Sequence, residues 1–242
     1  MDEETKFYST NKGTVALKGS AKNDIIKLLM EGDKTSSDIQ DELGRAKSTI
    51  SVHLSDLKKL GVIDERTHPE DSRKKIFSLK STFVGSSDVP SKEQYNIILE
   101  NLGDARGDRY QFLKTMFHLI RYGLHSLGLD LDPALKEMGR DAGLSLAEYF
   151  SSNDLEELIR EIGEFWESNG LGKVSVPDRE TILVHDCFDC GGMPEVDHEL
   201  CSLDEGLLEG IIEGRLGLRV EIQERECSGT GADHCRFQIR GV

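Results

Sequence analysis

All five cysteines of this 242-residue chain lie in its last quarter, so that segment holds the residues best suited to chemistry. They are Cys187, Cys190, Cys201, Cys227 and Cys235. A disulfide scaffold would use an even number of cysteines and spread them along the chain. In a reducing compartment, a cluster of this kind favours metal binding or thiol redox chemistry.

Three of the cysteines and one glutamate have the side chains and spacing of a metal site. Cys227 and Cys235 flank the loop SGTGADH, whose two glycines allow it to fold back and bring the thiols together. Glu224 ends the strand expected before that loop, and Cys201 lies just before a predicted helix. Three thiolates and one carboxylate can form a closed tetrahedral zinc site, which is structural rather than catalytic.

Other interpretations of this set remain open from spacing alone. Cys201 and Cys235 would also suit positions for small buried apolar side chains. An imidazole can replace one of the proposed ligands, and the candidates are His185, His198 and His234.

Cys187 and Cys190 form a separate Cys-x-x-Cys pair in the segment HDCFDCGG. Such a pair is either half of a metal site or a reversible dithiol. A thioredoxin-like nucleophile needs a helix N-terminus that lowers its pKa, whereas this pair follows a predicted strand. Asp186 and Asp189 add negative charge, which disfavours a thiolate. We therefore expect a slow redox dithiol, a labile metal site or two ordinary loop thiols.

Charge is unevenly distributed along the chain, whose formal net charge is −15. Residues 1–80 hold 15 Lys and Arg against 14 Asp and Glu, a net charge of +1, so the remainder has a net charge of −16. A near-neutral segment can still concentrate positive charge on one face. If this N-terminal segment binds DNA, the acidic remainder must lie away from the phosphates and serve another purpose.

The hydrophobic pattern of the N-terminal segment predicts three helices followed by a β-hairpin, which is the order of a winged helix-turn-helix. The expected elements are helices over 20–32, 36–44 and 46–60, a strand starting at Val62, a turn over 67–72 and a strand over 75–79. Ser20 is the expected N-cap of the first helix, and Ser36 or Ser37 that of the second.

The third helix and the hairpin carry side chains suited to DNA. Small or hydrogen-bonding residues near the helix N-terminus would meet base edges and phosphates, and a basic hairpin suits a wing on the DNA backbone or in the minor groove. The alternative is a three-helix unit with a solvated polar face. The predicted DNA-binding residues are Lys47, Ser48, Thr49, Ser51 and His53 on the helix and Arg66, Arg73, Lys74 and Lys75 on the hairpin.

The segment STISVHLSDLKKLGVI, followed by a charged hairpin, resembles the ArsR-type winged-helix family. This resemblance implies a DNA-binding transcription regulator. We expect a homodimer that binds a palindromic operator, with its two recognition helices about 34–36 Å apart in successive major grooves.

The remaining residues predict an α+β domain. Its expected helices cover 106–127, 133–150, 154–168 and 203–214, and its expected strands cover 172–177, 181–187, 217–224 and 235–240. The apolar stripe of the first of these helices packs on its own domain or on a partner subunit. The expected domains are a winged helix over 1–85, a linker over 86–95 and a domain for sensing and dimerisation over 96–242.

The pattern C-x22-E-x2-C-x7-C-x-F resembles the 4-vinyl-reductase domain. The matching residues are Cys201, Glu224, Cys227, Cys235 and Phe237. The resemblance implies an α/β fold like that of vesicle-tethering subunits, a tendency to dimerise, and a structural zinc ion held by the three cysteines and the glutamate.

A winged helix joined to a 4-vinyl-reductase domain with extra cysteines resembles the methanogen-specific archaeal regulators of that type. That resemblance implies a redox-responsive regulator in which oxidation of the C-terminal cysteines changes DNA binding. In related phenol sensors the domain holds an aromatic ligand, so a small-molecule-responsive regulator is one alternative. Phe165 and Trp166 are candidates to line such a pocket, although aromatic residues on a helix more often belong to the core.

A dithiol oxidoreductase with an accessory DNA-binding head is the alternative of another class. It needs an activated cysteine, and we see no Ser/His/Asp set, phosphate loop or open metal site, so we expect no enzyme activity. The polar, acidic N-terminus lacks the features of a secretory signal. No apolar run approaches the length that a membrane span needs. These features predict a cytoplasmic protein.

Overall fold

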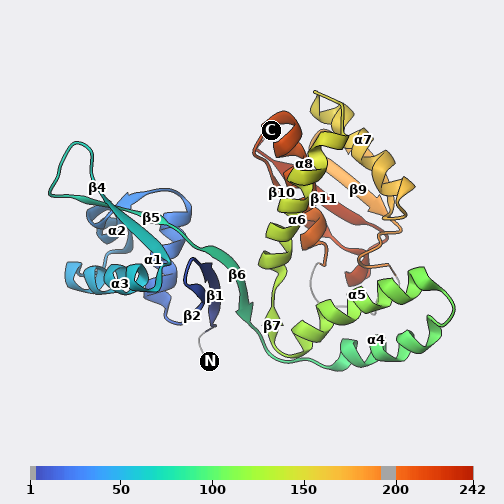
Figure 1. The fold of residues 1–242 in the computed structure, drawn as a ribbon, viewed down its shortest axis with the longest axis horizontal. Coiled ribbons are helices and arrows are strands. Elements are labelled where there is room, and N and C mark those ends of the chain that lie inside the picture. The colour runs from blue at the N-terminus through green and yellow to red at the C-terminus, as the bar shows by residue number, and fades with distance from the viewer. Residues whose placement is uncertain (1–3, 192–199, 242) are drawn as a thin grey trace. The chain divides into compact units, whose positions relative to one another are not determined.

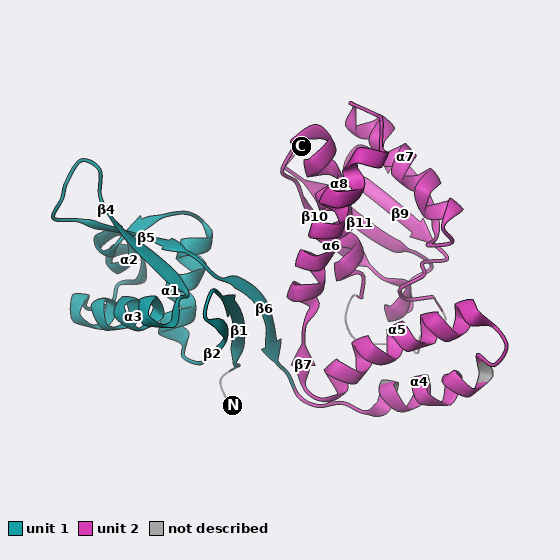
Figure 2. Cartoon of the chain, viewed as in Figure 1, with its two compact units in different colours: residues 1–88 teal, residues 89–242 magenta. Residues whose placement is uncertain are grey.

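The chain forms two compact units, residues 1–88 and residues 89–242, which we call the head and the tail (Figures 1 and 2). The computed structural model describes residues 4–191 and 200–241. Each unit has its own cluster of buried apolar side chains. Among the described residues, no helix is both long and apolar enough to cross a bilayer.

The head contains the three helices and the hairpin that the sequence predicts (Figure 1). Strand β5 pairs with β3 and β4, and a second group places β1 between β2 and β6. The elements are β1 (Lys6–Thr10), β2 (Gly13–Leu17), α1 (Ser20–Met30), β3 (Lys34–Thr35), α2 (Ser36–Leu43), α3 (Lys47–Leu60), β4 (Ile63–Thr67), β5 (Lys75–Leu79) and β6 (Thr82–Ser87).

The N-caps of the first two helices differ from those expected. Gly19 is the N-cap of α1 and makes no side-chain bond, so Ser20 is the first helical residue. Thr35 caps α2 and forms a capping box with Asp38: the Asp38 backbone N–H donates to the Thr35 hydroxyl at 3.3 Å, and the Thr35 N–H donates to the Asp38 carboxylate at 2.8 Å. A residue whose side chain reaches the third helical N–H is the better cap, which explains why Thr35 takes this place.

The tail has a four-stranded antiparallel sheet in the order β10-β11-β9-β8, accompanied by helices α6, α7 and α8. Its elements are α4 (Glu93–Asp104), α5 (Arg109–Ser126), β7 (Leu129–Asp130), α6 (Asp132–Leu146), the 3-10 turn η1 (Ala147–Tyr149), α7 (Leu155–Ser168), β8 (Lys173–Asp178), β9 (Thr181–His185), α8 (Ser202–Leu216), β10 (Glu221–Glu226), the 3-10 turn η2 (Ser228–Thr230) and β11 (Cys235–Arg240).

The segment between head and tail differs from the expected linker. Residues 86 and 87 are the last of β6, and α4 begins at Glu93, so both ends of the 86–95 range carry regular structure. Helix α4 was not predicted at all, because its polar first turn follows directly on the Ser- and Pro-containing stretch. The strand expected over 217–224 runs instead from Glu221 to Glu226, since the helix before it extends to Leu216.

Helices α6 and α8 approach each other closely because each presents glycines to the other's backbone. A Cβ placed on Gly139 would lie 2.1 Å from the carbonyl oxygen of Leu203, and one on Gly143 would lie 2.2 Å from that of Leu207. Gly206 of α8 faces α6 in the same way, its Cβ position lying 1.9 Å from the Lys136 carbonyl oxygen. No side chain fits between these two helices along this contact.

We predict that Gly143→Ala destabilises the tail, although alanine is the better helix former by about 1 kcal/mol. The added methyl group must push α8 away, and overpacking of this kind costs about 1–3 kcal/mol. Urea denaturation followed by circular dichroism measures the change. Gly103→Ala in α4 is the matched control, because no atom lies within 4 Å of its Cβ position; equal effects of the two substitutions would contradict this packing.

Candidate functional site

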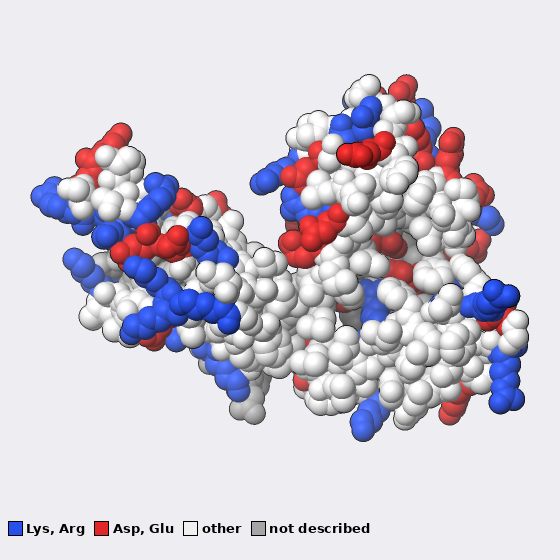
Figure 3. Space-filling view, viewed as in Figure 1, with Lys and Arg blue, Asp and Glu red and all other residues white. Residues whose placement is uncertain are grey.

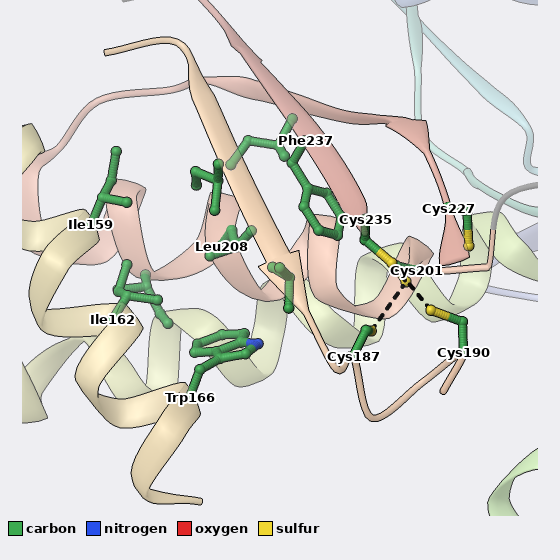
Figure 4. Packing of buried hydrophobic residues seen from close by; sticks show 14 of the residues in the cluster. Ile159, Ile162, Trp166, Cys187, Cys190, Cys201, Leu208, Cys227, Cys235 and Phe237 are labelled. Atoms are coloured by element: carbon green, nitrogen blue, oxygen red, sulfur yellow. Dashed lines mark hydrogen bonds between the residues drawn. The ribbon is translucent and has the colours of Figure 1, made fainter. Parts of the chain in front are cut away.

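The five cysteines meet at one end of the tail sheet, where four segments converge (Figure 4). Cys187 and Cys190 lie in the turn after β9, and Cys201 is the N-cap residue of α8. Cys227 follows β10, and Cys235 begins β11. All five side chains are at most 2% exposed. The cluster is therefore part of the core and is shielded from bulk solvent.

The thiols lie within contact distance of one another. The Sγ atoms are separated by 3.1 Å between Cys190 and Cys235, 3.7 Å between Cys187 and Cys201, and 3.9 Å between Cys201 and Cys235. All five cysteines are in the free thiol form. The two groups that the sequence analysis treated as separate, the Cys-x-x-Cys pair and the metal-site cysteines, thus form one cluster.

Glu224 points into this cluster from β10. Because side chains alternate along a strand, Ile222 and Glu224 share the buried face. One carboxylate oxygen, Oε2, accepts backbone N–H groups of Leu200 and Cys201 at 3.0 Å each. The other, Oε1, is buried and has no hydrogen-bond partner. Burial, and next the nearby Cys227, raise the pKa of this carboxyl to about 8.

The donor set fits a zinc ion. The ligand atoms of Cys201, Glu224, Cys227 and Cys235 all lie within 4.8 Å of one another. A buried carboxylate oxygen without a partner is costly, and a bound cation would satisfy it. His185 and His234 belong to none of the candidate metal-binding groups found among the described residues, and His198 lies outside those residues.

The turn that carries Cys187 and Cys190 packs against helix α5 through Phe188. The Phe188 ring lies 5.6 Å from that of Tyr110 and 6.2 Å from that of Phe117, and the Lys114 ammonium lies 5.4 Å from its centre. In the same turn, the buried carboxylate of Asp189 lies 3.5 Å from the Arg121 guanidinium. A change in the geometry of the turn would therefore be felt along α5.

In the head, α2, α3 and the β4–β5 hairpin enclose a groove of about 520 Å³. Five cations and only one carboxylate, Glu65, line it, and Figure 3 shows Lys and Arg side chains gathered over this part of the head. The five are Lys47, Lys58, Arg73, Lys74 and Lys75. Glu65 lies 3.2 Å from the Lys58 ammonium and 3.3 Å from that of Lys75. The groove keeps a clear excess of positive charge.

The structure brings five of the predicted DNA-binding residues into this groove. Ser51 lines it together with four of the predicted cations, Lys47, Arg73, Lys74 and Lys75. Ser48, Thr49 and Arg66 are exposed elsewhere on the same two elements.

His53 differs from the expectation of an open polar face, because it is half-buried and its Nδ1 atom is enclosed without a partner. Ser55 and Lys58 line the groove but were not predicted. Their spacing from Ser51, four and seven residues further along α3, places them on one face.

The tail has no ligand-sized cavity beside Trp166 in the part of the chain that the structure describes. Trp166 is 2% exposed in the main core, and the gap next to it measures about 10 Å³, hardly enough for one water molecule. A larger cavity of about 200 Å³ lies between α5 and α6 and is lined mainly by apolar side chains, with Arg121 and Tyr122 among them. The Tyr122 hydroxyl is buried there without a hydrogen-bond partner.

Comparison with known protein families accounts for parts of both units. Residues 19–65 match the model of the bacterial regulatory protein arsR family, and residues 181–241 match that of the vinyl-4-reductase domain. The chain thus joins an ArsR-type helix-turn-helix to a vinyl-4-reductase domain, which confirms the two resemblances and the α+β fold class. This combination indicates a DNA-binding transcription regulator.

The similar proteins found in sequence are uncharacterized proteins of the methanogen Methanocaldococcus jannaschii. One is 28% identical over 128 residues, which cover 52% of this chain and 74% of that protein. Another is 31% identical over 86 residues, which cover 35% of this chain and 53% of that protein. The chain therefore spans only about half of the second relative.

Solved structures give more distant matches. A vinyl-4-reductase family protein from Methanocaldococcus jannaschii is 15% identical with a TM-score of 0.40, and the match covers 61% of this chain and 92% of that one. The phenol-responsive sensory domain of the transcription activator PoxR is 16% identical with a TM-score of 0.35, over 77% of this chain and 87% of that one.

Proposed function

We propose that the chain is a redox-responsive transcription regulator, in which the state of the tail cysteines changes how tightly the head binds its operator. The observation that carries this proposal is the 3.1 Å separation of the Cys190 and Cys235 Sγ atoms within the buried cluster. A disulfide needs an S–S distance of about 2.05 Å, so a shift of about 1 Å would let this pair react.

The redox step joins Cys190 to Cys235. A peroxide accepts two electrons and two protons from the two thiols; its O–O bond breaks, an S–S bond forms, and with hydrogen peroxide two water molecules leave. The new bond pulls the turn of residues 187–190 toward β11. Because Phe188 of that turn packs against Tyr110 and Phe117, the pull is transmitted to α5.

A structural zinc ion supports this arrangement. Cys201, Glu224, Cys227 and Cys235 would hold it, and the bound ion would cross-link the start of α8 to the neighbouring strands. Cys235 belongs both to this set and to the reactive pair. Its oxidation therefore removes one metal ligand at the same time as it moves the turn.

We predict that the oxidised and reduced full-length proteins bind the same DNA with affinities that differ about fivefold or more, a typical allosteric coupling. The DNA is a duplex selected from random sequences by the reduced protein, and gel-shift titration with and without reductant measures the affinity. Equal affinity in the two states rules out the switch.

Cys190→Ser should abolish this difference. Cys187→Ser, from the same turn, is the matched control: its thiol lies 3.7 Å from that of Cys201, outside the reactive pair, and the response should survive its loss. Mass spectrometry of the oxidised protein should find the Cys190–Cys235 peptide pair.

The groove of the head is the proposed DNA interface, with α3 in the major groove and the hairpin on the backbone. We predict that Arg73→Ala weakens binding to all sequences and lowers the slope of log affinity against log salt by about one. Ser51→Ala should instead reduce discrimination among operator sequences. Fluorescence anisotropy at several salt concentrations measures both effects. Lys18→Ala, an exposed cation outside the groove, should change neither; an effect as large as that of Arg73 would place the interface elsewhere.

Helix α5 is the proposed contact between two copies of the chain. Leu113, Ile120 and Leu127 recur every seven residues and are 66%, 62% and 67% exposed. A heptad stripe can pair with its own copy about a two-fold axis. Two paired heads would also bind a palindromic operator more tightly than the single head, whose net charge is small.

We predict that Leu113→Asp combined with Leu127→Asp converts a dimer into a monomer, because two charges would be buried in the contact. Sedimentation equilibrium measures the mass. Tyr149→Asp is the control, since Tyr149 is 81% exposed and lies on η1. A wild-type monomer, or a dimer that survives the double substitution, contradicts the assignment of α5.

A small-molecule-responsive regulator is the second candidate, favoured by the cavity of about 200 Å³ between α5 and α6. Its apolar lining and the unpartnered Tyr122 hydroxyl suit a small aromatic or hydrocarbon ligand with a polar group. Under this proposal, DNA binding would respond to the ligand and remain unchanged when Cys187 and Cys190 are both replaced by serine.

A further inference from the structure

The cysteine cluster contains two candidate metal sites that share two ligands. In each group of four, the ligand atoms lie within 4.8 Å of one another. The first group is Cys187, Cys190, Cys201 and Cys235, and the second is Cys201, Glu224, Cys227 and Cys235. Cys201 and Cys235, whose Sγ atoms are 3.9 Å apart, belong to both. The cluster as a whole offers six donors.

A single tetrahedral ion cannot use this whole donor set. It takes four ligands and would leave two buried donors of the cluster without a role. Two tetrahedra that share one edge need six donors, two of which bridge. The number of donors in the cluster, and the identity of the two shared ones, both agree with this second arrangement.

We propose that the cluster is a binuclear centre for two thiophilic divalent ions, bridged by the thiolates of Cys201 and Cys235. Cys187 and Cys190 complete the first ion's coordination, and Glu224 and Cys227 complete the second. Five sulfur donors select Zn²⁺, Cd²⁺ or Co²⁺ over Mg²⁺ or Ca²⁺. The centre adds a second ion to the zinc site of the proposed function, on which it rests.

The sulfur spacing agrees with this arrangement. Metal–sulfur bonds of about 2.3 Å in a tetrahedral site put neighbouring sulfurs about 3.8 Å apart. The separations of 3.7 Å between Cys187 and Cys201 and 3.9 Å between Cys201 and Cys235 are close to that value. The Cys190–Cys235 pair, at 3.1 Å, would have to move apart by about 0.7 Å.

The charge of the buried cluster also favours two ions. Five thiolates and one carboxylate carry six negative charges, so one divalent ion leaves four of them uncompensated in the core, where isolated charge is costly. Two ions leave two. The cations of Lys114 and Arg121 act on the cluster from α5, although Arg121 also faces Asp189 at 3.5 Å.

The experiment counts ions in the full-length protein. The metal-free, reduced protein is titrated with Co²⁺ under anaerobic conditions, while absorption from thiolate to Co²⁺ charge transfer and the electron paramagnetic resonance signal are recorded. We expect the absorption to rise up to two equivalents. The resonance signal should rise and then fall as the second Co²⁺ couples magnetically to the first through the bridging thiolates. Native mass spectrometry of the Zn²⁺-loaded protein should find two ions per chain.

Variants separate the two halves of the centre. Cys187→Ser with Cys190→Ser, and Glu224→Gln with Cys227→Ser, should each lower the count from two ions to one, and circular dichroism reports whether each variant folds. If either variant fails to fold, the Co²⁺ coupling in the wild-type protein still decides.

One ion per chain at saturation, two ions without magnetic coupling, a count unchanged in both folded variants, or iron with acid-labile sulfide would each overturn the proposal. Gel-shift assays on the same preparations keep the outcomes distinct. A protein with one ion that still responds to peroxide leaves the regulator intact and removes only the second ion.

Discussion

The burial of five thiols and one carboxylate at a single point is the constraint on which the tail depends. These donors come from the turn after β9, the start of α8, the end of β10 and the start of β11, so each of these segments ends at the cluster. The unpartnered Oε1 atom of Glu224 has a desolvation cost that nothing else among the described residues offsets. A metal ion would offset it and would hold the four segments together.

The close contact of α6 with α8 serves the same end. Because their glycines allow backbone against backbone, α8 is held along its length while Cys201, its N-cap residue, enters the cluster. A rigid α8 leaves the turn of Cys187 and Cys190 as the segment of the cluster that can adjust. That turn is also the one whose Phe188 packs on α5. Rigidity on one side and an aromatic contact on the other give a change at the thiols a defined direction.

Sequence patterns predicted the elements with strong periodicity but not those that depend on tertiary packing. The apolar spacing of Ile50, Leu54 and Leu57 was enough for α3, and the Cys/Glu spacing was enough to select four donors that the fold brings within 4.8 Å. By contrast, α4 begins in a polar stretch that resembles a linker. Nothing in the spacing indicated that Cys187 and Cys190 would join the metal-site cysteines, because that contact is made by a turn folding across the sheet end.

The distribution of charge connects the two units. The head concentrates five cations in one groove although residues 1–80 have a net charge of only +1, and several of those cations already pair with neighbouring acids. Exposed pairs of this kind are worth less than about 1 kcal/mol each, so phosphates can replace the carboxylates at little cost. The gain per head is correspondingly small, and two heads acting together would bind far more tightly than one. A tail that sets how two heads are paired therefore has more influence on DNA binding than any change within the groove itself.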